Sequence, residues 1–77
     1  MNLLQAFEKI KSDYAGKQCL IARYQGPRED NVRVCIKVED DLIALSAFPI
    51  TVDDMLADDW ELLVSYKMGN SYEEVEQ

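Results

Sequence analysis

The sequence contains no histidine among its 77 residues. This absence removes the commonest general base and every Ser-His or Cys-His nucleophile pair, so that only carboxylates remain for acid–base chemistry. The two cysteines, Cys19 and Cys35, lack the CxxC spacing of a metal site and indicate reduced packing residues, with a cross-strand disulfide as the alternative. We therefore expect no catalytic residues, no cofactor and no metal, and a protein that binds and is not an enzyme.

Long apolar runs are also missing. None approaches the roughly 20 residues that span a bilayer, and the first residues show no basic stretch followed by an apolar run and a cleavage site. These features predict a cytoplasmic protein with no membrane contact. Nearly half of the residues are nevertheless apolar (48%), which is typical of a folded domain and argues against disorder.

Basic residues are few and unevenly placed. Residues 1–37 hold seven of the eight lysines and arginines, whereas residues 38–77 hold Lys67 and eleven of the fifteen acidic residues. A net charge of −7 with this polarity does not suit a long phosphate backbone, so we expect no polymeric nucleic acid as a partner. One small anion could still be held locally, and the candidates for this role are Arg23, Arg28, Arg33 and Lys37.

Apolar spacing predicts an N-terminal amphipathic helix over about residues 3–15. Asn2 can cap its start, and Gly16 lies where a left-handed helix end is expected. Strands are predicted at residues 18–24, 32–38, 42–48 and 60–66, with alternation that places Val32, Val34, Ile36 and Val38 on one face. Turns at 25–31 and 39–41 separate the first three of these strands.

A capping box predicts a second, short helix over about residues 52–57. Thr51 would be its N-cap and Asp54 the residue three positions on. The sequence thus indicates one α+β domain over residues 1–66, with an N-terminal helix packed on an antiparallel sheet of about four strands and a short helix before the last strand. Residues 67–77 form a polar, acidic tail, which we expect to be flexible.

Two predicted strands are apolar on both faces. The runs 19–22 and 42–45 contain no charged residue, whereas a sheet covered by one helix should be polar on its outer face. Another copy of the chain is the available cover, so we expect a homo-oligomer, a dimer or a tetramer.

A sequence resemblance arises from the Gly16-Lys17 start, the Ala22-Arg23 strand end and above all the segment 49–62, Pro-Ile-Thr-Val-Asp-Asp-Met-Leu-Ala-Asp-Asp-Trp-Glu-Leu. Over roughly residues 2–64 the chain resembles the small phage-encoded domain family of the second Thoeris anti-defence protein. The resemblance implies an α+β homo-oligomer in the cytosol of the host cell, and a sponge that sequesters a cyclic nucleotide-derived immune signal without cleaving it. Family members tend to have a tryptophan shortly after the arginine, where this chain has Tyr24.

The candidate ligand-binding residues follow from this resemblance and from the charge distribution. Arginine is suited to a phosphate group and aromatic side chains to a base, and the candidates are Arg23, Tyr24, Gln25, Phe48 and Trp60. Two of these have structural alternatives, because a strand-end arginine is commonly ion-paired and a tryptophan that alternates with Leu62 is commonly a core residue. The alternative function is an acidic protein–protein interaction module that inhibits a host protein.

Overall fold

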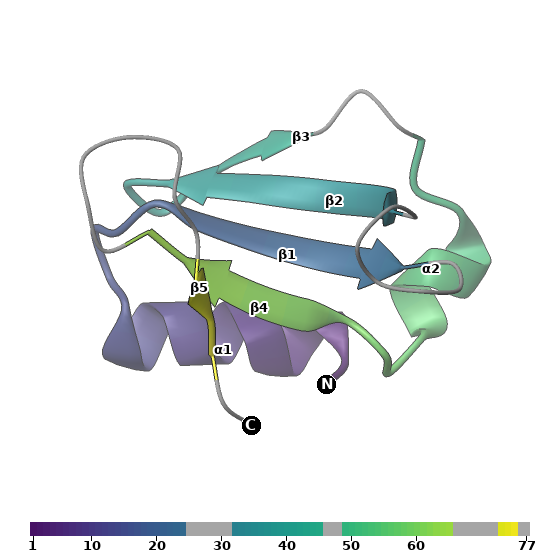
Figure 1. The fold of residues 1–77 in the computed structure, drawn as a ribbon, viewed down its shortest axis with the longest axis horizontal. Coiled ribbons are helices and arrows are strands. Elements are labelled where there is room, and N and C mark those ends of the chain that lie inside the picture. The colour runs from purple at the N-terminus through teal and green to yellow at the C-terminus, as the bar shows by residue number, and fades with distance from the viewer. Residues whose placement is uncertain (25–31, 46–48, 66–72, 76–77) are drawn as a thin grey trace.

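The structure is a computed structural model, and it describes residues 1–24, 32–45, 49–65 and 73–75. An N-terminal helix packs against an antiparallel sheet, and a short helix precedes the strand β4, so the α+β prediction is confirmed (Figure 1). No helix in the described ranges is long and apolar enough to cross a membrane.

Helix α1 (Leu3–Asp13) begins at a complete capping box. The Asn2 side chain accepts a hydrogen bond from the Gln5 backbone N–H at 2.8 Å, and the Gln5 side chain accepts one from the Asn2 N–H at 2.9 Å. These bonds satisfy N–H groups that a helix start leaves without partners. Beyond the last turn, Gly16 has a φ of 78°, the left-handed conformation that favours glycine. The sequence predicted both ends of this helix to within two residues.

The sheet consists of β1 (Cys19–Tyr24), β2 (Val32–Glu39), β3 (Leu42–Leu45), β4 (Glu61–Val64) and β5 (Glu73–Glu74). Their order is β3-β2-β1-β4-β5, and all described neighbours are antiparallel. The first four strands correspond to the four that the sequence predicted, of which residues 46–48 and 66 lie outside the described ranges. The short fifth strand extends the sheet beyond β4.

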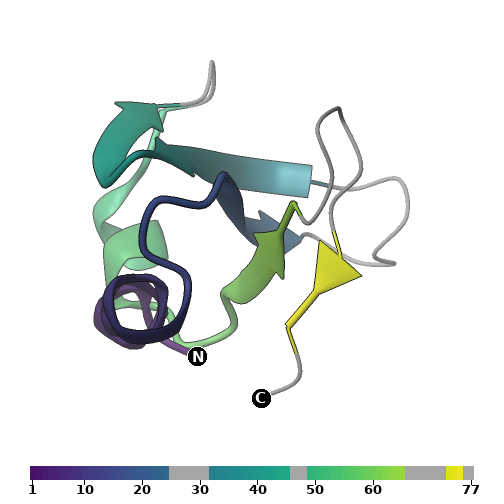
Figure 2. The same cartoon turned by 90° about the vertical axis from the view of Figure 1, so that its left-hand side faces the viewer.

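The register aligns apolar residues of three strands on the face that α1 covers. Ile21 of β1 lies between Ile36 of β2 and Leu62 of β4, and all three side chains are buried. Figure 2 looks along the axis of α1 and shows it below this face of the sheet. The core therefore lies between α1 and the central strands, as the alternation predicted. Val32, at the start of β2, is the exception because 43% of it is exposed.

A tight hairpin joins β2 to β3. Glu39 pairs with Leu42, and the two residues between them, Asp40 and Asp41, have φ values of 50° and 63°. Positive φ at both central positions is the requirement of a type I′ turn, whose twist matches that of the flanking strands. Aspartate tolerates this conformation better than most residues do.

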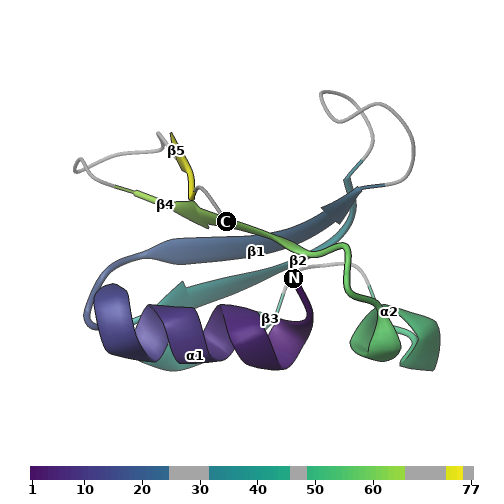
Figure 3. The same ribbon diagram turned by 90° about the horizontal axis from the view of Figure 1, so that it is seen from below.

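Helix α2 (Val52–Leu56) lies on the same face of the sheet as α1, beyond the N-terminal end of that helix (Figure 3). The predicted capping box between Thr51 and Asp54 is present, so the start of this helix is confirmed. The side of α2 that faces the sheet, its inner side, lies near the C-terminal end of β1 and the N-terminal end of β2 (Figure 1).

The acidic tail differs from its prediction at the residues that the structure describes. Glu73 and Glu74 pair with Val64 and Leu63 of β4, and the Val75 N–H donates to the Leu62 carbonyl oxygen at 2.9 Å. Val75 is buried in the core. Burial of one valine and backbone pairing with β4 together hold this segment, although the residues around it are acidic.

Candidate functional site

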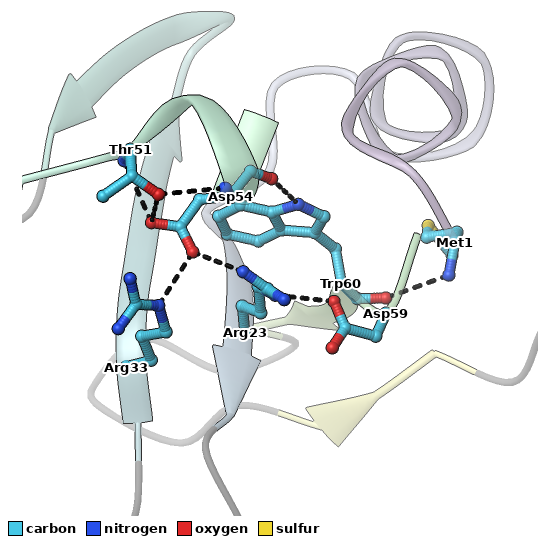
Figure 4. Close-up of polar contacts among 7 residues, drawn as sticks. All are labelled: Met1, Arg23, Arg33, Thr51, Asp54, Asp59 and Trp60. Carbon is cyan, nitrogen blue, oxygen red and sulfur yellow. Dashed lines mark hydrogen bonds and ion pairs between the residues drawn. The ribbon is translucent and has the colours of Figure 1, made fainter. Parts of the chain in front are cut away.

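A buried carboxylate, Asp54 of α2, is the centre of the most connected polar cluster in the described structure. Its side chain is 1% exposed. Oδ2 accepts hydrogen bonds from the Thr51 backbone N–H at 3.0 Å and from the Thr51 hydroxyl at 2.9 Å. The capping box thus fixes one carboxylate oxygen and leaves Oδ1 facing the sheet (Figure 4).

Two arginines from neighbouring strands donate to Oδ1 of Asp54. Nη1 of Arg23, in β1, lies 2.5 Å from this oxygen, and Nε of Arg33, in β2, lies 2.9 Å from it. Arg23 also donates through Nε to Oδ1 of Asp59 at 2.7 Å. One carboxylate therefore holds two guanidinium groups beside each other at the end of the sheet (Figure 4).

Hydrogen bonding keeps the cluster ionised. The backbone N–H of Thr51 holds the pKa of Asp54 well below its usual range, and the two arginines act in the same direction, against the opposing effect of burial. Hydrogen bonds to Asp59 and Asp54 raise the pKa of Arg23. Two guanidinium groups against one buried carboxylate leave one positive charge, which the exposed Asp59 carboxylate compensates.

Trp60 lies on the side of the cluster that faces the hydrophobic core. Its side chain is fully buried, and the indole N–H donates to the Asp54 backbone oxygen at 2.8 Å. Its backbone exchanges hydrogen bonds with Met1, whose carbonyl oxygen accepts from the Trp60 N–H at 3.0 Å. The core alternative for this tryptophan is therefore the one that the structure shows, and its ring offers no surface to a ligand in this conformation.

The other predicted ligand-binding residues lie as follows. Arg23 is in the cluster, with 22% of its side chain exposed, and the ion-paired alternative describes it. Tyr24 is half-buried at the end of β1, next to Arg23 in the chain. Gln25 and Phe48 lie outside the described residues.

Sequence reasoning did not find that Asp54 joins two strands to α2. It identified Asp54 as a capping residue and Arg33 as one of several anion candidates, but no local pattern links residues 21 and 31 positions apart. One signal in the sequence was the aspartate at position 54. A capping box more commonly has glutamate at this position, and aspartate has the shorter side chain. A charged residue in a segment with apolar neighbours is also a candidate for a buried ion pair.

The acidic residues and cysteines of the described parts of the chain do not gather in one place. These parts contain no group of three or more histidine, cysteine or acidic residues that could hold a metal ion. Cys19 and Cys35 are both free thiols, and burial raises the pKa of Cys19, which keeps it in the less reactive thiol form.

A groove of about 260 Å³ lies between α1 and β3 and is mainly apolar, with Lys11 and Asp41 among the residues that line it.

Comparisons with known proteins give no family assignment: no protein-family model, no curated protein and no solved structure matches this chain.

Proposed function

We propose that this protein binds a small, anionic, nucleotide-derived signalling molecule and sequesters it without cleaving it, as a phage anti-defence protein would. The sequence resemblance described above suggests the ligand class. The structural observation that carries the proposal is the pair of arginines, Arg23 and Arg33, held beside each other by one buried carboxylate. The absence of histidine supports binding without hydrolysis.

The arginine pair has the properties of a preformed phosphate site. Arg33 contacts Asp54 through Nε, and 40% of its side chain is exposed, so the pair is not sealed from a ligand. Asp59 is 57% exposed, and an exposed ion pair contributes little stability. A phosphate group that replaces Asp59 beside Arg23 would meet two guanidinium groups in a fixed orientation, which favours bidentate hydrogen bonds.

We further propose that the binding unit is a homo-oligomer, a dimer or a tetramer, with the ligand at a subunit boundary. The face of the sheet opposite α1 is partly apolar, since Leu20 pairs with Leu63 there and both side chains are only half-buried. Cys35, also half-buried, shares this face. A second copy could cover these residues, and sedimentation equilibrium at micromolar concentration tests this because a monomer would contradict it.

Calorimetric titration tests the ligand proposal. The titrants are cyclic dinucleotides, cyclic trinucleotides and cyclic ADP-ribose isomers, and the proteins are the parent chain, Arg33→Ala and Asp59→Asn. We expect one titrant class to bind, Arg33→Ala to weaken it by roughly tenfold or more through loss of a charged hydrogen bond, and Asp59→Asn to strengthen it by removal of the competing carboxylate. Arg23→Ala should weaken binding similarly if its fold is intact.

Lys9→Ala is the matched control, because Lys9 is a cation that pairs with Asp13 on α1, away from the cluster, and 42% of its side chain is exposed. It should leave binding unchanged. Failure of every titrant to bind the parent would contradict the proposed function. Binding that survives Arg33→Ala and Arg23→Ala unchanged would place the ligand elsewhere.

A further inference from the structure

Helix α2 has the reverse of the burial pattern of an ordinary surface helix. Its buried residue is the aspartate Asp54, whereas Val52, Met55 and Leu56 are 74%, 56% and 79% exposed. An amphipathic helix on a protein surface normally buries its apolar residues and exposes its polar ones. We call Val52, Met55 and Leu56 the outer face of α2.

The fold itself does not use this outer face. Hydrogen bonds attach the inner side of α2, through the Asp54 carboxylate to Arg23 and Arg33, and through the Asp54 backbone oxygen to the Trp60 indole. Figure 3 shows α2 at one end of the helix-bearing face, beyond α1. Single exposed apolar residues are common, but these three have the spacing i, i+3 and i+4 and therefore share one side of the helix, and grouped exposed apolar side chains are typical of interaction sites.

The chemistry around the patch identifies what could cover it. Two exposed acidic residues accompany the patch, since Asp53 lies between Val52 and Met55 in sequence and Asp58 lies two residues after Leu56. Residues 38–66 contain no lysine or arginine. A partner that combines an apolar surface with positive charge at its edge would complement these residues. An apolar contact surrounded by opposite charges also gives specificity and fast association.

We propose that the outer face of α2 docks a partner protein whose binding surface is apolar and bordered by lysine or arginine side chains. A second copy packed symmetrically, α2 against α2, fits less well, because a two-fold contact would bring Asp53 and Asp58 of both copies together. This inference is independent of the proposed ligand site, which lies on the inner side of the same helix.

The test uses a synthetic helical peptide that carries leucine along one face and lysine along the other. A second peptide of the same composition in scrambled order keeps the charge and removes the apolar stripe. Fluorescence anisotropy of the labelled peptides measures affinity, and amide chemical shifts of the full chain locate the contact. We expect the ordered peptide to bind at least about tenfold more tightly than the scrambled one, with the largest shifts in residues 52–58.

The decisive variant is Leu56→Ser, which we expect to weaken the ordered peptide by at least about tenfold. Leu4→Ser and Leu42→Ser are the matched controls, because Leu4 in α1 and Leu42 in β3 are 69% and 72% exposed. Both controls should bind the peptide like the parent chain. Charge reversal by Asp53→Lys should weaken binding and reduce its dependence on salt.

Each other outcome overturns the proposal. Equal affinity for the scrambled peptide would mean that charge alone is recognised. Absence of binding would mean that the outer face does not recognise a partner of the stated chemistry. An equal effect of Leu4→Ser or Leu42→Ser would place the contact elsewhere. If sedimentation shows that the parent self-associates and that Leu56→Ser does not, the occupant is a second copy.

Discussion

The two helices begin in the same way but attach to the rest of the fold by different interactions, apolar packing in α1 and charged hydrogen bonds in α2. Each starts with a capping box, at Asn2 in α1 and at Thr51 in α2. Helix α1 then buries apolar side chains such as Ile10, whereas α2 buries a carboxylate and exposes its apolar residues. The comparison teaches that a local start signal specifies a helix but not which of its faces will be buried. Long-range contacts decide that, and in α2 they are charged.

Removal of the carboxylate that attaches α2 should have the largest effect. Asp54→Asn retains the shape of the side chain but leaves Arg23 and Arg33 without their buried counter-charge, and breaking such a contact from one side is strongly destabilising. We expect a larger loss of thermal stability at neutral pH than for the other variants below. Asp53→Asn is the control, since Asp53 is an exposed acid on the same helix, and it should melt like the parent chain.

The same pair of proteins should differ in acid. The pKa of Asp54 is lower in the folded protein than its ordinary value near 3.8, so ionisation of this group stabilises the fold fully above that value. The contribution declines as the pH falls below about 4 toward the folded pKa. The stability gap between parent and Asp54→Asn should therefore narrow in acid, measured by urea unfolding between pH 7 and pH 2.5. A constant gap would contradict the assignment.

Truncation in α1 should have the next largest effect and should show no such pH dependence. Ile10 is 3% exposed, and Ile10→Ala should lower the free energy of unfolding by about 2–5 kcal/mol through lost burial and a residual cavity. Leu4→Ala on the same helix removes an exposed side chain and should change it by less than about 0.5 kcal/mol. Urea unfolding followed by circular dichroism gives both values, and similar losses would mean that α1 is packed differently.

The smallest effect is expected on the outer face of α2. Leu56→Ser should change the free energy of unfolding by no more than about 0.5 kcal/mol, because the leucine contributes exposed surface and no core packing. The measurement is the same urea unfolding. A loss as large as that of Ile10→Ala would show that the fold itself uses this residue, which would remove the contrast between the two helices.

Local patterns predicted most of the fold. The alternation of Val34, Ile36 and Val38 identified the buried face of β2, and the capping box located the start of α2. These features depend on residues close in sequence, where spacing determines which side chains share a face. The segment 73–75 was missed because its pairing with β4 depends on contacts across the sheet, and its composition resembles that of a disordered tail.

The candidate site was predicted less completely for the same reason. Arg23 was identified from its place at a strand end, but its fixed orientation comes from Asp54 and Asp59, far along the chain. Trp60 illustrates the opposite case, because alternation with Leu62 indicated the core while the resemblance suggested a ligand contact. Burial of its whole side chain matches the alternation. Periodicity was the better guide here because it reports directly on which face of a strand is covered.

The polar attachment of α2 also bears on the order in which the chain assembles. Helix α1 satisfies its first N–H groups within residues 2–5, but the bonds that position α2 join residues 31 positions apart, and those between Met1 and Trp60 span 59. Contacts of such separation cost more loop-closure entropy than contacts within one helical turn, so we expect them to form later in folding. We expect the arginine pair and the outer face of α2 to exist together only once the sheet is complete. Any ligand or partner that binds them would therefore select the finished fold and stabilise it by mass action.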